Sequence, residues 1–120
     1  MKILATDMDG TFLDHLGAYD KARLENLLDA CEAEDYVFTV ASGRALLALE
    51  ELFDGFVDRI AIIAENGALV QYKGEVLFES KLEPKDYLEI ADTTLALPTC
   101  EGILLSGRRG AYAPNDADPA

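Results

Sequence analysis

Two carboxylates, at positions 7 and 9, are the side chains of this sequence best suited to chemistry. They lie in the string Asp7-Met8-Asp9-Gly10-Thr11, directly after a short apolar run over residues 2–6. Gly10 permits a turn that directs both carboxylates toward one site. Carboxylate oxygens suit Mg²⁺, which also accepts water and phosphate oxygens as ligands. One carboxylate can attack phosphorus to form an aspartyl-phosphate, while the other handles the leaving-group proton.

Two further polar motifs each follow a predicted strand. In Ala41-Ser42-Gly43-Arg44, a hydroxyl, free backbone N–H groups and a guanidinium fork together suit an anion. Taken alone, that motif is better explained by a helix N-cap serine followed by a solvated arginine, and the anion-site interpretation gains weight because the second strand is expected beside the first, which brings Ser42 near Asp7. In Glu65-Asn66-Gly67, Asn66 either turns the chain or donates its amide to the substrate or to a catalytic carboxylate. His15 is expected to be a solvated loop residue.

The hydrophobic pattern predicts strand, helix, strand, helix, strand, which is a doubly wound α/β core with right-handed crossovers. Strands are expected at 2–6, 36–40 and 59–64, and the first is expected to be buried on both faces of a parallel sheet. A helix capped by Asp20 and a second helix follow the first two strands. Their expected core-facing residues are Leu24, Leu27, Leu28, Cys31, Leu46, Leu49 and Phe53. Because ligands gather at the carboxyl ends of strands in open α/β sheets, we expect the three polar motifs to meet there.

After residue 67, the predicted order of elements no longer alternates between strands and helices. Residues 68–72 and 75–79 flank Lys73-Gly74 and predict a β-hairpin. Pro84 fits the first turn of a helix that ends before Pro98. Short strands are expected at 102–106 and 110–113, and residues 114–120 are expected to form a loop.

Composition excludes several classes of protein. The 120 residues are half hydrophobic, with 23 acidic and 10 basic side chains and a net charge of -13. The length fits one ordinary domain. The negative charge disfavours a nucleic-acid or anionic-membrane partner, and no apolar run approaches the ~20 residues of a membrane span. Cys31 and Cys100 are two lone thiols without a disulfide framework, so we expect a cytoplasmic setting.

The three motifs together resemble the haloacid dehalogenase superfamily. A strand ending in DMDGTFLD, another ending in VASGR and a third ending in AENGA are similar to its Cof-type sugar-phosphatase branch, whose α/β cap is inserted after the third strand. The resemblance implies that residues 1–81 form the N-terminal part of a Rossmann-like core and that residues 82–120 begin the cap. It also implies a Mg²⁺-dependent phosphatase that acts on a small phosphorylated substrate, such as a sugar phosphate, through an aspartyl-phosphate.

The same resemblance implies roles for individual residues. Asp7 would be the nucleophile and Asp9 the general acid/base, and Mg²⁺ would bind Asp7 and the Met8 carbonyl. Thr11 would brace the motif loop, and Ser42 would hold the phosphate. The implied phosphate- and substrate-binding residues are Gly10, Thr11, Ser42, Gly43, Arg44 and Asn66.

The sequence also departs from the family pattern. The family uses a later lysine beside the phosphate and a later acidic pair around Mg²⁺, and nothing after Asn66 fits either. We therefore interpret the chain as a fragment that has little activity alone and that self-associates through an unfinished sheet. Two alternatives stay open: a receiver-like phospho-acceptor signalling domain, and a non-catalytic α/β fragment that needs a partner.

Overall fold

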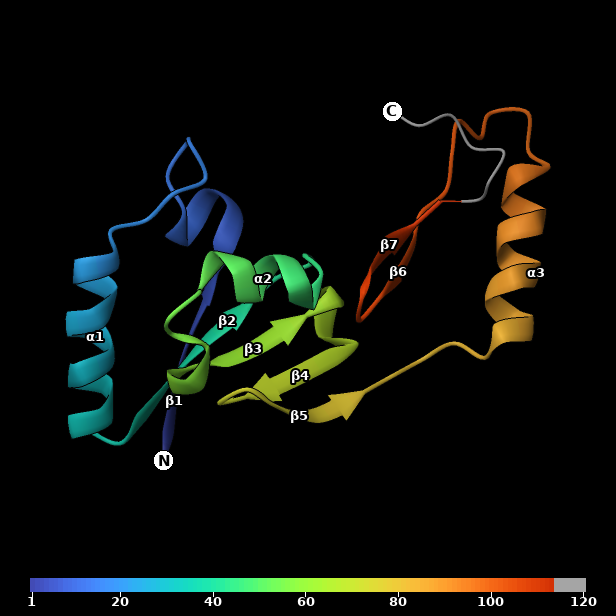
Figure 1. Ribbon diagram of the computed structural model, residues 1–120. Coiled ribbons are helices and arrows are strands. Elements are labelled where there is room, and N and C mark those ends of the chain that lie inside the picture. The colour runs from blue at the N-terminus through green and yellow to red at the C-terminus, as the bar shows by residue number, and fades with distance from the viewer. Residues whose placement is uncertain (114–120) are drawn as a thin grey trace. The chain divides into compact units, whose positions relative to one another are not determined.

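The computed structural model describes residues 1–113, and the predicted loop at 114–120 lies outside them. The chain divides into two compact units, Met1–Glu79 and Ser80–Ala120. The first unit contains a sheet with strand order β1-β2-β3-β4-β5 (Figure 1). Its strands are β1 (Lys2–Asp7), β2 (Tyr36–Ala41), β3 (Ala61–Ala64), β4 (Leu69–Tyr72) and β5 (Glu75–Glu79). Its helices are α1 (Lys21–Ala33) and α2 (Leu46–Leu52), with single 3₁₀ turns at Val57–Arg59 and Glu65–Gly67.

The sheet is parallel over its first three strands and antiparallel over the last two. β1 pairs with β2 and β2 with β3 in parallel, whereas β4 and β5 continue the sheet as an antiparallel hairpin. The predicted α/β, Rossmann-like fold is confirmed. Since the carboxyl ends of β1, β2 and β3 meet at one edge, the residues after these strands are brought together.

The core of this unit lies on one face of the sheet. Phe38, Val40 and Ile62 share that face and are at most 3% exposed. They form one cluster with residues of both helices, so α1 and α2 pack against the same face. The predicted core-facing residues of the helices are confirmed: Leu24, Leu28, Cys31, Leu46, Leu49 and Phe53 are buried, and Leu27 packs against them.

Local sequence signals explain how the elements begin and turn. The Asp20 side chain accepts a hydrogen bond from the backbone N–H of Arg23 at 3.1 Å, which is the predicted N-cap of α1. Lys73 and Gly74 both have positive φ, as a two-residue hairpin turn requires. This turn joins β4 to β5, so the predicted hairpin is confirmed.

Two expectations about the strands are wrong. β1 is not buried on both faces, because it lies at the edge of the described sheet and has β2 as its neighbour there; Ile3 is 67% exposed and Leu4 is 40% exposed. The third strand does not begin at Arg59, because Val57–Arg59 forms a 3₁₀ turn and β3 starts at Ala61. A short apolar run does not reveal how many neighbours a strand has or where its extended backbone begins.

The second unit is built around one helix and one small hairpin. Helix α3 (Pro84–Leu95) has its proline at the first turn, as predicted. Strands β6 (Leu105–Gly107) and β7 (Gly110–Tyr112) pair in antiparallel fashion. These strands are shorter than expected. Within residues 1–113, no helix is long and apolar enough to cross a membrane.

Candidate active site

The segment Asp7-Met8-Asp9, called the DxD motif below, lies where β1 ends. Asp7 is the last residue of β1 and is in register with Ala41 of β2. The chain then makes a wide turn over Met8–Phe12, in which Gly10 adopts a φ of 78° that a side chain would disfavour. The Met8 side chain is fully buried, and the Met8 carbonyl accepts a hydrogen bond from the N–H of Leu13 at 3.0 Å. The backbone of the turn is thus anchored in the core while Asp7 and Asp9 stay exposed.

Thr11 contacts the carboxylate of Asp7, which the family resemblance implies to be the nucleophile. Its hydroxyl donates a long hydrogen bond of 3.4 Å to Asp7 Oδ2. The other carboxylate oxygen of Asp7 has no protein hydrogen bond within the described residues. Asp7 therefore keeps lone pairs available for a phosphorus atom or a cation.

Ser42 lies beside this turn, at the end of β2. Its backbone N–H donates to the Ile63 carbonyl at 2.9 Å, and its Oγ accepts from the N–H of Arg44 at 3.1 Å. Because Oγ is an acceptor here, the hydroxyl hydrogen is free to donate to a ligand. The N-cap explanation of Ser42 is wrong: helix α2 begins only at Leu46, and its N-cap residue is Ala45.

The Asn66 turn is tied to the Ser42 loop by backbone hydrogen bonds. The N–H of Asn66 donates to the Ser42 carbonyl at 3.1 Å, and the N–H of Glu65 donates to the Arg44 carbonyl at 3.0 Å. Glu65 and Asn66 both have positive φ, a conformation that ordinary residues rarely adopt. The expected amide contact with a catalytic carboxylate is not formed, since no hydrogen bond joins Asn66 to Asp7 or Asp9 within residues 1–113.

A close approach explains the glycine of this loop. A Cβ at position 43 would lie 2.9 Å from Asn66 Oδ1. That separation is too short for real carbon–oxygen contacts, so the Asn66 side chain occupies the space that Gly43 leaves. The ends of β2 and β3 are therefore packed together by a glycine and an asparagine.

Arg44 crosses from the Ser42 loop to the DxD turn. Its Nε donates to Asp9 Oδ2 at 3.0 Å and its Nη2 donates to Asp9 Oδ1 at 2.6 Å. The hydrogen bonds from Arg44 hold the pKa of Asp9 below its ordinary value, and the same pairing raises the pKa of Arg44. The expectation of a solvated arginine is wrong, because the tertiary structure supplies a carboxylate 35 residues earlier in the chain.

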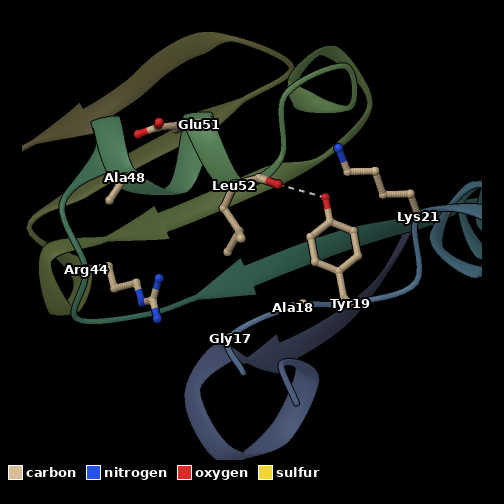
Figure 2. A pocket seen from close by; sticks show the side chains of 8 residues that line it. All are labelled: Gly17, Ala18, Tyr19, Lys21, Arg44, Ala48, Glu51 and Leu52. Atoms are coloured by element: carbon tan, nitrogen blue, oxygen red, sulfur yellow. Dashed lines mark hydrogen bonds between the residues drawn. The ribbon is translucent and has the colours of Figure 1, made fainter. Parts of the chain in front are cut away.

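An open groove of about 480 Å³ lies next to Arg44, between the loop at residues 17–21 and α2 (Figure 2). The Tyr19 hydroxyl donates to the Leu52 carbonyl at 2.8 Å and ties the loop to the helix. The groove is lined by Gly17, Ala18, Tyr19, Lys21, Arg44, Ala48, Glu51 and Leu52. Apart from Arg44, none of these residues was expected at the site. The Asp14 carboxylate accepts from the N–H groups of Leu16 and Ala18 and shapes the loop, and an Asp with a glycine three residues later is the signal that predicts such a turn.

Comparison with known proteins decides the family. The sequence profile of the haloacid dehalogenase-like hydrolases matches residues 4–119. The chain belongs to this family. Its Asp7, Ser42 and Asn66 motifs are the residues on which the resemblance was recognised, and that prediction is confirmed.

Individual proteins resemble the chain over 80% or more of its length. It is 32% identical over 120 residues to the 5-amino-6-(5-phospho-D-ribitylamino)uracil phosphatase YbjI of Escherichia coli K12, and the match covers 100% of this chain. The crystal structure of SMU.1108c from Streptococcus mutans UA159 is 32% identical, covers 98% of this chain and 44% of its own, and superposes with a TM-score of 0.88. A haloacid dehalogenase-like hydrolase from B. subtilis, 24% identical, covers 80% of this chain and 34% of its own with a TM-score of 0.67, and it supports the fold. The chain spans 44% of the length of YbjI.

The oxygen atoms of Asp7 and of the Met8–Phe12 turn fit Mg²⁺ in type but not in number. Asp7 offers carboxylate oxygens, and the Met8 carbonyl retains one lone pair beside its hydrogen bond with Leu13. Mg²⁺ prefers six oxygen ligands in octahedral geometry. Within the described residues, no group of three or more His, Cys, Asp or Glu side chains is placed to hold a metal ion. These residues can therefore supply only part of a magnesium shell.

The histidine and the two cysteines of the chain take no part in the candidate site. His15 is exposed, as expected for a loop residue. Cys31 and Cys100 are both free thiols, and burial raises the pKa of the Cys31 thiol. A buried thiol with a raised pKa is a core residue rather than a nucleophile.

Proposed function

We propose that this chain carries the nucleophile and phosphate-binding part of a Mg²⁺-dependent phosphoric monoester hydrolase. The observation that carries the proposal is the placement of Asp7 and Ser42 after neighbouring parallel strands, with Asp9 on the same turn as Asp7. The family assignment and the phosphatase name of the E. coli relative support it. The substrate class we propose is a small phosphorylated metabolite, such as a sugar phosphate, and the setting is the cytoplasm.

In the proposed reaction, an Asp7 oxygen attacks the phosphorus atom and the bond to the leaving-group oxygen breaks. The leaving oxygen takes a proton from Asp9, which leaves an aspartyl-phosphate on Asp7. Asp9 then accepts a proton from water, and the resulting hydroxide attacks phosphorus and releases inorganic phosphate and the free Asp7 carboxylate. The Ser42 hydroxyl donates a hydrogen bond to a phosphate oxygen.

The charge state of Asp9 in the structure suits the second step of this reaction, the attack of water on the aspartyl-phosphate. Because Arg44 lowers the pKa of Asp9, the ionised form that accepts a proton from water is favoured in the structure. A phosphate bound beside Asp7 and Asp9 would add negative charge there, and like-charge repulsion would favour the protonated form of Asp9 that the first step needs. Mg²⁺ bound at Asp7 and the Met8 carbonyl would neutralise charge on the phosphate.

The second unit has a separate role in the proposal. We assign residues 1–81 to the hydrolase core and residues 82–120 to the beginning of a cap that selects the substrate. The division of the chain into units at Glu79 and Ser80 supports this assignment. The non-catalytic alternative, in which the chain needs a partner to complete its site, predicts no phosphorylation of Asp7.

Phosphorylation of Asp7 in a single turnover tests the proposed function. The chain is incubated with Mg²⁺ and a reactive aryl phosphate, and the phosphorylated peptide is identified by mass spectrometry. We expect slow labelling of Asp7, since the described residues supply only part of a magnesium shell, and we expect Asp7→Asn to abolish labelling, because an amide is a very poor nucleophile. Asp58→Asn is the matched control, since Asp58 is exposed and lies in the 3₁₀ turn before β3. Labelling that persists in Asp7→Asn, or its absence from the unaltered chain, contradicts the proposal.

A further inference from the structure

The carboxylate of Asp9 depends on one side chain for its orientation. Its two oxygens accept from Arg44 Nε and Nη2 at 3.0 Å and 2.6 Å. Within residues 1–113, no other residue forms a hydrogen bond or ion pair with it. The Asp9 side chain is 65% exposed, so neither packing nor a second partner restricts its rotation.

Arg44 is held at its backbone on both sides. Its N–H donates to Ser42 Oγ at 3.1 Å, and its carbonyl accepts from the N–H of Glu65 at 3.0 Å. These bonds connect Arg44 to the ends of β2 and β3, while its guanidinium reaches a turn that follows β1. The arginine fork therefore links two loops that meet only through tertiary structure.

The backbone at Asp9 is also fixed. Met8 before it is fully buried, and the Met8 carbonyl accepts from the N–H of Leu13 at 3.0 Å. Only the χ angles of Asp9 are left to be determined, and a bidentate fork restricts these angles in a way that a single charge does not.

We propose that Arg44 is a positioning residue that orients the Asp9 carboxylate toward the reacting oxygen, and is not a phosphate ligand. This inference rests on the proposed function, because the orientation of Asp9 matters to the reaction only if Asp9 exchanges a proton with the reacting oxygen. Asp9 engages the Nε and Nη2 side of the guanidinium, which leaves the Nη1 side for other contacts, and we assign the phosphate to the Ser42 hydroxyl and neighbouring backbone N–H groups. An exposed ion pair contributes little to the free energy of unfolding, so we assign the Arg44–Asp9 pair the role of fixing the orientation of the Asp9 carboxylate.

Side-chain NMR of Asp9 tests the positioning role without requiring turnover. We expect the Asp9 side chain to be ordered in the unaltered chain and mobile in Arg44→Gln. Arg44→Lys keeps the charge but loses the fork, so we expect it to restore the order only in part. Arg59→Gln is the matched control, because Arg59 also donates to two carboxylate oxygens, at 2.7 Å to Asp29 and 2.8 Å to Glu32, away from the site. An ordered Asp9 in Arg44→Gln, or equal disorder in Arg59→Gln, overturns the inference.

Titration with inorganic phosphate separates positioning from ligation. We expect the phosphate affinity of Arg44→Gln to stay within about threefold of the unaltered chain, because the guanidinium is not a ligand. A loss of about tenfold or more, the size expected for a charge-assisted hydrogen bond, assigns Arg44 to the phosphate and overturns the inference.

Single-turnover rates show whether Arg44 acts through Asp9. We expect Arg44→Gln to slow phosphorylation of Asp7 by about 10- to 100-fold, the cost of a misplaced catalytic group. Arg44→Gln combined with Asp9→Asn should be no slower than Asp9→Asn alone, whereas multiplied losses overturn the inference. If Asp7 is not phosphorylated at all, the proposed function fails, while the NMR measurement still decides how Asp9 is held.

Discussion

The two units of this chain differ in how much apolar surface they bury. The first unit has a cluster of fourteen buried hydrophobic residues that joins α1, α2 and the sheet. In the second unit, Ala91 is the only hydrophobic residue among the described ones that is buried. Its exposed large hydrophobic residues are Leu82, Leu88, Ile90, Leu95, Leu97, Leu104 and Tyr112.

This difference indicates where a precise site can be built. Asp7, Ser42 and Asn66 lie at or just after the ends of β1, β2 and β3. Met8, Val40 and Ala64, each within two residues of one of them, are fully buried, so the backbone at the site is held by the core. A single helix and a two-stranded hairpin bury too little surface to be rigid by themselves. The described part of the second unit therefore offers a less rigid framework for a precise site than the first unit does.

Matched leucine substitutions should give the largest effect. Leu49 in α2 is fully buried, whereas Leu88 in α3 is 53% exposed. We expect Leu49→Ala to lower the free energy of unfolding by about 3–5 kcal/mol, because it removes packed methyl groups and leaves a cavity. Leu88→Ala should change it by about 0.5 kcal/mol or less. Urea unfolding followed by circular dichroism measures both, and equal losses would show that the second unit has a core of its own.

Self-association should distinguish the exposed apolar residues of the two units. Ile3 is 67% exposed on the edge strand β1, and Leu104 is 72% exposed outside the strands. We expect β1, which has no neighbouring strand on one side among residues 1–113, to pair there with a second copy of the chain, because an edge strand presents unpaired backbone groups. Sedimentation velocity should show association that Ile3→Lys weakens by about tenfold, since an edge lysine opposes strand pairing. Leu104→Lys should have no comparable effect; the reverse order of the two variants would place the interface in the second unit.

Two glycines should give the smallest and most local effect. A Cβ at position 43 would meet Asn66 Oδ1 at 2.9 Å, whereas a Cβ at position 102 would meet nothing within 4 Å. We expect Gly43→Ala to displace the Asn66 side chain and to cost about 1 kcal/mol, because only a flexible amide has to move. Gly102→Ala should change stability by a few tenths of a kcal/mol. The side-chain amide signal of Asn66 in a ¹H–¹⁵N spectrum reports the displacement, and an unmoved signal in Gly43→Ala would contradict the close approach.

Much of the secondary structure in both units was predictable because its signals are local. Asp20 caps α1, Lys73-Gly74 turns the hairpin, and Pro84 begins α3, each through interactions between residues close in sequence. Errors arose where neighbours distant in sequence decide the outcome. The exposure of Ile3 depends on which strands lie beside β1, and an apolar run of five residues contains no information about that.

The sequence alone determined which residue types form the candidate site and that they lie where strands end. These residue types are two carboxylates, a hydroxyl, an arginine and an asparagine. Strand ends that share one edge of a parallel sheet bring such residues together, so the meeting of Asp7 and Ser42 followed from the strand pattern. Only the tertiary structure decided what each side chain contacts. It directed Arg44 to Asp9, packed Gly43 against Asn66 and opened a groove beside Tyr19. These contacts depend on distances of a few ångströms between separate loops, which residue types and spacing do not specify.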